Sequence, residues 1–263
     1  MKTALITGAT RGIGYDLAKI FAMESHNLVL VSRNEQKLRD IQYDFSVRYK
    51  IDVHIIAKDL SKDHAATQIF KEVMDKKISV DVLINNAGVG DFSLFSDEDL
   101  GRITRMLHLN IVSLTELTRL FIPQMVERKE GRIMNVSSLA AFLPGPYMAV
   151  YYASKAYVKS FSEAIANELK DTGVTVTALC PGLTKTGFQE NVGGEKTRMA
   201  RMNLLASSES VAKYAYKAMY EGKEVAVPGI INNSIAMTSR IIPAKIKSSV
   251  IRMIQELNRK KVF

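Results

Sequence analysis

A chain of 263 residues, 47% apolar and 24% charged, can bury one large core, and this composition excludes an intrinsically disordered protein. Residues 229–263 hold seven bases and one acid, so they contribute +6 of the net charge of +9 and leave a body without the strong positive charge of a nucleic-acid-binding protein. The single cysteine, Cys180, excludes a disulfide framework, no apolar run is long enough to span a membrane, and we expect a cytoplasmic protein.

The chain begins with a predicted strand, a glycine-rich turn and a helix. Residues 2–7 form a short apolar run, and the following helix extends to about residue 25. Between them stand Gly8, Gly12 and Gly14, which let the backbone approach a pyrophosphate at a helix N-terminus with free N–H groups. Their Gly-x-x-x-Gly-x-Gly spacing differs from the Gly-x-Gly-x-x-Gly of other dinucleotide folds. The strand–turn–helix context is what predicts a dinucleotide site here.

The second predicted strand, residues 27–31, ends at Ser32 and Arg33. In dinucleotide-binding folds an acid at this place accepts a hydrogen bond from the adenosine ribose, whereas an arginine favours the 2′-phosphate of NADP(H). The sequence has Arg33 here with no acid opposing it, and Arg11 in the glycine turn can add a second positive charge. We therefore predict a preference for NADP(H) over NAD(H), with a solvated loop arginine as the alternative interpretation of Arg33.

Strands and helices alternate along the rest of the chain. We expect helices over residues 34–49, 61–77 (with Ser61 as N-cap), 97–107, 109–127, 151–173 and 207–220, and strands over residues 52–57, 81–85, 131–136, 174–179 and 224–227. This alternation predicts an α/β fold, a single-domain Rossmann-like doubly wound parallel sheet with helices on both faces, formed by residues 1–228. Residues 187–206 lack a clear periodicity, and we expect them to form a mobile lid over the substrate.

Tyr151 and Lys155 are four residues apart on one predicted helix and therefore lie on the same face. A neighbouring ammonium favours the phenolate, so Lys155 is expected to lower the pKa of Tyr151 from about 10 towards the range of a general acid or base. The same spacing arises by chance on many helices. Tyr152, three residues before Lys155, could share that face and is the alternative to Tyr151.

The motifs together resemble those of the short-chain dehydrogenase/reductase family over about residues 2–227. In the family's order they are Thr7-Gly8-x-x-x-Gly12-x-Gly14, Asn85-Asn86-Ala87-Gly88, Asn110, Ser138, Tyr151-x-x-x-Lys155 and Pro181-Gly182. The family usually separates its serine and tyrosine by thirteen residues, as Ser138 and Tyr151 are separated here. This separation favours Tyr151 over Tyr152 and Ser138 over Ser137.

The resemblance implies a role for each motif. Tyr151 would exchange a proton with the substrate oxygen, and Ser138 would hydrogen-bond that oxygen. Lys155 would hold the nicotinamide ribose, and Asn110 would position a water that relays protons. The residues implied to bind the cofactor are Gly8, Thr10, Arg11, Gly12, Ile13, Gly14, Arg33, Asp59, Leu60, Asn86, Ala87, Gly88, Tyr151, Lys155, Pro181, Gly182, Thr184 and Thr186. No metal is expected.

The activity that follows is NADPH-dependent reduction of a carbonyl group to an alcohol, reversible in principle. The alternative is a non-catalytic NADP-binding scaffold or redox sensor, and the complete set of implied catalytic residues argues against it. Residues 139–150 and 187–206 are rich in Ala, Leu, Met and Phe, so an apolar ketone or a 3-oxoacyl thioester fits better than a sugar or an acid. The chain resembles in particular the 3-oxoacyl-carrier-protein reductases and carbonyl reductases.

Residues 229–263 form a basic extension beyond the family's usual ending. Ile246, Val250, Ile254 and Leu257 recur at roughly helical spacing with bases between them. Three interpretations remain open: packing on the body or a sister subunit, a peripheral membrane anchor, and docking of an acidic carrier protein. Packing is favoured. We expect a homodimer or homotetramer that uses the helices over residues 109–127 and 151–170, with the extension covering subunit or pocket surface.

Overall fold

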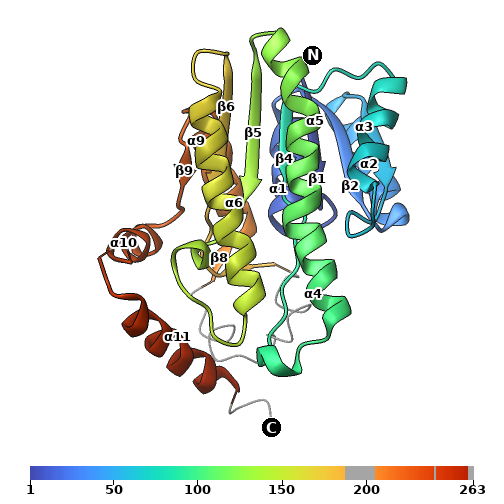
Figure 1. The fold of residues 1–263 in the computed structure, drawn as a ribbon. Coiled ribbons are helices and arrows are strands. Elements are labelled where there is room, and N and C mark those ends of the chain that lie inside the picture. Colours follow the sequence, from blue (N-terminus) through green and yellow to red (C-terminus); the bar gives the residue numbers. More distant parts are fainter. Residues whose placement is uncertain (187–204, 240, 260–263) are drawn as a thin grey trace.

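The computed structural model describes residues 1–186, 205–239 and 241–259, and its centre is a seven-stranded parallel sheet (Figure 1). The strands are β1 (Thr3–Thr7), β2 (Asn27–Ser32), β3 (Val53–Ala57), β4 (Val82–Asn85), β5 (Gly131–Val136), β6 (Val174–Leu179) and β9 (Val225–Ala226). Their order across the sheet is β3-β2-β1-β4-β5-β6-β9. This order confirms the predicted doubly wound Rossmann-like fold, and it places a crevice at the carboxyl ends of β1 and β4, where the strand order reverses.

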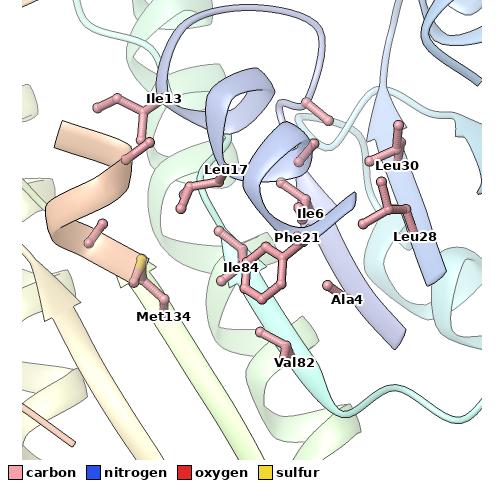
Figure 2. Close-up of a cluster of buried hydrophobic side chains, with 14 of the residues drawn as sticks. Ala4, Ile6, Ile13, Leu17, Phe21, Leu28, Leu30, Val82, Ile84 and Met134 are labelled. Atoms are coloured by element: carbon pink, nitrogen blue, oxygen red, sulfur yellow. The ribbon is translucent and has the colours of Figure 1, made fainter. Parts of the chain in front are cut away.

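Helices cover both faces of the sheet because the side chains of each buried strand alternate between two cores. On β1, Ile6 belongs to one core and Leu5 to the other. The first face is covered by α1 (Gly12–Met23), α2 (Glu35–Tyr49) and α9 (Ser208–Tyr220), and the second by α3 (Ala65–Asp75), α5 (Ser113–Glu127) and α6 (Ala149–Glu168). Figure 2 shows the first core, where Leu17 and Phe21 of α1 lie over the strands beside Ile84. Each fully buried side chain of this kind contributes about 1.5–3 kcal/mol to folding.

The helix expected to begin at Ser61 begins later, at Ala65. Its N-cap residue is His64, which has a left-handed φ of 62°. Ser61 instead donates through its backbone N–H and its hydroxyl to Oδ1 of Asp59, at 3.0 and 2.7 Å. These local bonds hold the chain after β3 in a turn, so the predicted N-cap at Ser61 is wrong.

The two helices expected over residues 97–107 and 109–127, with Asn110 near their junction, form an almost unbroken helical run. α4 (Leu100–Leu107) starts after an Asp99 N-cap, a π-helical turn (His108–Val112) follows, and α5 continues from Ser113. The predicted start at residue 97 lies in a short 3-10 turn (Phe95–Asp97). Asn110 is inside the π-helical turn, and such turns occur frequently at functional sites.

The helix that carries Tyr151 ends at Glu168, before the predicted end at Gly173. Gly173 has a φ of 83°, and a Cβ at this position would overlap the backbone of Lys129. Lys129 precedes β5 and Gly173 precedes β6, and these two strands are neighbours in the sheet. The glycine therefore permits a close approach of two turns rather than ending the helix directly.

The C-terminal extension forms two helices, α10 (Ile230–Thr238) and α11 (Ala244–Arg259), where we expected one helical pattern. They lie outside the three layers, at the end of the molecule towards which the strands point (Figure 1). Ile246, Val250, Met253 and Leu257 form a stripe along α11 in which each residue is 45–58% exposed. The body of the chain therefore leaves this apolar stripe of α11 uncovered.

A two-stranded pairing joins the segments on either side of the predicted lid. β7 (Thr184–Lys185) pairs in parallel with β8 (Ala206–Ser207). Residues 187–204 of the predicted lid lie outside the described residues. Within the described part of the chain, no helix combines the length and the hydropathy that crossing a bilayer requires.

Candidate active site

A cavity of about 460 Å³ opens at the carboxyl ends of the central strands. Its walls come from the segments that directly follow β1, β2, β3, β4, β5 and β6. Among the predicted site residues, those that line it are Gly8, Thr10, Arg11, Gly12, Ile13, Arg33, Asp59, Leu60, Asn86, Ala87, Gly88, Ser138, Tyr151, Lys155, Pro181, Gly182, Thr184 and Thr186. Gly14 and Asn110 are the two predicted site residues outside this lining, and both are buried.

The glycine turn fits a phosphate-bearing ligand. α1 starts at Gly12, and its N-cap residue, Arg11, is extended and makes no side-chain cap, so the N–H groups of the first turn are available to an anion. Gly8 has a φ of 68°, and a Cβ there would lie 2.8 Å from Nδ2 of Asn86. A Cβ on Gly14 would overlap the carbonyl oxygen of Gly8. Side chains at these positions would collide with the protein itself, so the turn needs glycine at both to pack against Asn86 in this conformation.

The segment after β4 is tied to the glycine turn. The side chain of Asn86 donates to the backbone oxygens of Thr7 and Gly8, at 2.9 and 3.2 Å. The hydroxyl of Thr7 accepts from the backbone N–H groups of Asn86 and Ala87, at 2.9 and 3.0 Å. These bonds use the side-chain N–H groups of Asn86 to hold the two segments together. Asn86 therefore supports the shape of the glycine turn.

The edge of the cavity beyond β2 carries positively charged side chains and one negatively charged side chain. Arg33 is exposed and lines the cavity with Arg11 and Lys58, the last of which sequence reasoning missed. Asp59 is also here: burial raises the pKa of its carboxyl, but hydrogen bonds from Ser61 and the charge of Arg33 outweigh burial and lower it. The expectation that no acid opposes Arg33 is therefore wrong, although cations outnumber the acid at this edge.

Tyr151 and Ser138 lie close together in the wall of the cavity. Tyr151 is on the first turns of α6 and Ser138 directly follows β5, and the hydroxyl of Ser138 is close enough to lower the pKa of the Tyr151 phenol. The neighbouring Ser137 is buried and donates to the backbone oxygen of Lys155 at 2.7 Å, which makes it a structural residue. The structure thus brings Ser138, rather than Ser137, to the phenol of Tyr151, as the sequence predicts.

Lys155 is almost wholly buried beneath the same cavity, at 4% exposure. Its ammonium donates to the backbone oxygen of Val136 at 2.9 Å and lies 5.9 Å from the centre of the Tyr151 ring. Burial lowers the pKa of Lys155 to about 8 and raises the pKa of Tyr151 to about 12, the latter despite the nearby hydroxyl of Ser138. The expectation that Lys155 lowers the pKa of Tyr151 is wrong, because burial disfavours the phenolate and the group that partly offsets burial is Ser138 rather than Lys155.

The side chain of Asn110 connects the π-helical turn to Val89 and to Ser154. Its side chain donates to the backbone oxygen of Val89 and to the hydroxyl of Ser154, and it accepts from the backbone N–H of Val89, all at 2.9–3.0 Å. Both side-chain N–H groups are therefore used within the protein. A Cβ on Gly88 would lie 3.2 Å from Nζ of Lys155 and 3.3 Å from Oδ1 of Asn110, so both groups border the backbone of Gly88.

The segment after β6 closes the cavity from the other side. Thr184 donates to the backbone oxygen of Gly182 at 3.0 Å, and the methyl group of Thr186 lies so close to Gly12 that a Cβ there would approach it to 2.9 Å. Cys180, just before this segment, is fully buried, and burial raises the pKa of its thiol to about 11. We therefore interpret Cys180 as a structural thiol.

The remaining part of the cavity is mostly apolar. Its walls beside Tyr151 include Val89, Phe92, Leu139, Leu143, Met148 and Leu183. The polar side chains of Tyr152 and Gln255, which sequence reasoning did not assign to the site, also line the cavity. Gln255 belongs to α11, far from the family motifs in sequence, and only the general expectation that the extension covers pocket surface pointed to it.

Comparison with known proteins agrees with this arrangement. Residues 2–197 match the family model described as short chain dehydrogenase. The chain is 34% identical to ketoacyl reductase HetN of Nostoc sp., over 83% of this chain and 75% of that protein. It is 33% identical to the very-long-chain 3-oxoacyl-CoA reductase of Rattus norvegicus over 70% of this chain, and the match spans 59% of the rat protein.

The fold also matches that of a solved relative. The short-chain dehydrogenase from Sphingobium yanoikuyae, solved in complex with NADPH, has a TM-score of 0.83 and 26% identity, with 92% of this chain and 94% of the other covered. The matched family model covers the strand, glycine-turn and Tyr151–Lys155 regions from which the cavity is built. The chain therefore belongs to the short-chain dehydrogenase/reductase family of oxidoreductases, which bind a nicotinamide cofactor.

Proposed function

We propose that the chain is an NADPH-dependent reductase that converts an apolar ketone or a 3-oxoacyl compound into the corresponding alcohol. The observation that carries this proposal is that the hydroxyls of Tyr151 and Ser138 lie close together in the cavity that the glycine turn also lines. A carbonyl oxygen placed between these two hydroxyls would accept hydrogen bonds from both. When bound, the cofactor supplies the hydride to the carbonyl carbon.

Tyr151 is the proposed proton donor to the carbonyl oxygen. With a pKa of about 12 its phenol is protonated at neutral pH, so it is ready to act in the direction of reduction. Ser138 holds the same oxygen, and Lys155, with a pKa of about 8, is mostly charged at pH 7 and can return a proton towards the phenolate. Oxidation of an alcohol would need the phenolate first, so the raised pKa favours reduction at neutral pH.

The preference for NADPH is supported by the cations at the edge of the cavity. Arg33, Arg11 and Lys58 line this edge, and a 2′-phosphate would meet them at the surface of the molecule. Asp59 reduces this advantage but does not cancel it. The proposal also includes the residues named here for cofactor binding and proton transfer. It further includes a cytoplasmic location and a homo-oligomeric assembly.

The test is a screen of ketones, aldehydes and 3-oxoacyl thioesters with NADPH and with NADH, followed by loss of absorbance of the reduced cofactor. We expect reduction of apolar carbonyl compounds with NADPH and markedly weaker activity with NADH. A protein that binds NADPH tightly but reduces none of these compounds would instead support the alternative of a non-catalytic scaffold or redox sensor.

A further inference from the structure

The helix α11 reaches the cavity through two consecutive residues, Gln255 and Glu256. Oε1 of Glu256 accepts from the hydroxyl of Tyr147 at 2.9 Å and from Nε of Arg252 at 2.8 Å. Gln255 lines the cavity together with Tyr152, and its Nε2 donates to Sδ of Met148 at 4.0 Å. The extension is therefore attached to the segment that leads into α6 at two neighbouring points.

Tyr147 makes the first of these attachments rigid. It has a left-handed φ of 67°, and its ring stacks on Phe92 with the ring centres 5.8 Å apart. Its hydroxyl then reaches Glu256. Three segments distant in sequence, those after β4, before α6 and on α11, thus converge on one tyrosine, and this fixes the register in which α11 presents Gln255.

Tyr152 is held equally firmly on the other side of Gln255. Its ring packs so closely on Gly145 that a Cβ there would overlap it, and it meets the ring of Tyr151 edge-on with the ring centres 6.0 Å apart. Burial raises the pKa of the Tyr152 phenol, and the nearby side chain of Gln255 offsets part of this effect. The phenol is therefore neutral at physiological pH and can both donate and accept a hydrogen bond.

Among the residues that the structure describes, Tyr152 and Gln255 form a polar pair in a mostly apolar part of the cavity lining, separate from the pair formed by Tyr151 and Ser138. A carboxamide has two N–H donors and a carbonyl acceptor, so the contact with Met148 leaves Gln255 with capacity for a ligand. The two tyrosine rings are neighbours, and one small molecule can therefore contact both pairs. A ligand without a polar atom at the second pair would desolvate it without compensation.

We propose that Tyr152 and Gln255 form a second polar subsite, which binds a further oxygen of the substrate close to the reacting carbonyl. The enzyme then selects oxo compounds with a second oxygen, such as 3-oxo esters and 3-oxo thioesters, over simple ketones. This inference rests on the proposed function, since it assigns the substrate class of the same cavity. It also gives the C-terminal extension a part in specificity that the family motifs do not cover.

The experiment compares two substrates and three proteins with NADPH. Ethyl 3-oxooctanoate carries the second oxygen, and 6-undecanone has the same chain length, with its carbonyl at the same position, but lacks it. The proteins are the parent, Gln255→Met, which keeps the side-chain length and removes the amide, and Lys245→Met, a control on the exposed side of α11. The kcat and KM of each pair are measured with the melting temperature of each protein.

We expect the parent and Lys245→Met to prefer the 3-oxo ester. Gln255→Met should lose about tenfold or more in kcat/KM for the ester, mainly through KM, and change less than about twofold for 6-undecanone. Equal losses on both substrates would show a merely structural role and overturn the inference, as would a parent that does not distinguish them. In either case the proposed function stands, whereas a parent that reduces neither compound contradicts both.

Discussion

The buried ammonium of Lys155 leads to a prediction in which stability and activity change in opposite directions. Replacing Lys155 with Met removes a charge that is only 4% exposed. Burial lowers the pKa of this lysine from 10.5 to about 8, which corresponds to a cost of roughly 3 kcal/mol for keeping the charge in the folded protein. The carbonyl of Val136 loses its donor, at a cost of about 1 kcal/mol. The variant should therefore be more stable than the parent by about 2 kcal/mol at pH 7.

The pH dependence gives this prediction a second check. Between about pH 8 and pH 10.5 the unfolded chain binds the lysine proton and the folded chain does not, so the parent gains stability as the pH rises through this window. The cost is fully present below pH 8 and relieved above pH 10.5. Lys155→Met has no such group, and its advantage should shrink from pH 7 to pH 10.

Urea unfolding of the cofactor-free proteins at pH 7 and pH 10 measures both effects, with Lys245→Met as an exposed control that should behave as the parent does. In a separate thermal unfolding experiment at pH 7, the melting temperature of Lys155→Met should be several degrees above that of the parent. Its turnover should be lost. A variant less stable than the parent at pH 7, or one whose advantage is the same at both pH values, would refute the assignment of Lys155 as a buried charge held at a cost.

Three further predictions concern the cofactor site and the extension. Arg33→Ala should weaken NADPH about tenfold or more and leave NADH almost unchanged in a fluorescence titration, because a charge-assisted contact contributes about 1.5–3 kcal/mol; equal weakening of both cofactors would contradict the assignment. Gly14→Ala should lower both stability and cofactor affinity because its Cβ overlaps the carbonyl of Gly8, and unchanged binding in calorimetry would show that the turn has room. Truncation before Gly229 should lower the melting temperature and, in light scattering, the oligomeric mass. Unchanged assembly with lost sedimentation on anionic vesicles would instead assign the exposed stripe of α11 to a membrane surface.

The sheet and the position of the cavity could be predicted because they depend on strong local patterns. The strand over residues 131–136 and the serines that follow it were recognisable from one apolar run and its end. Because the carboxyl ends of parallel strands meet at one edge, the sequence alone brings Ser138 near the glycine turn around Gly8. The same argument applies to the segments after β4 and β6, which also line the cavity.

The features that could not be predicted depend on competition between local bonds or on burial. The predicted start of α3 was wrong because Ser61 hydrogen-bonds to Asp59 instead of capping the helix. Helix propensity does not decide between these two hydrogen-bonding patterns. The spacing of Tyr151 and Lys155 gave their common face, but not the burial that moves their pKa values in the unfavourable directions. Gln255 could not be assigned individually, since only the folded extension brings α11 to the cavity.

The central claim, that Tyr151 donates the proton in an NADPH-dependent reduction, is tested most directly with Tyr151→Phe. This change keeps the ring and removes the phenol hydroxyl that lies close to the hydroxyl of Ser138. The affinity for NADPH is measured by fluorescence titration, and the reduction of the best substrate from the screen by stopped-flow absorbance under single-turnover conditions. We expect NADPH to bind within about twofold of the parent, and the reduction rate to fall by about 10² or more. A variant that reduces the substrate as fast as the parent would contradict the account.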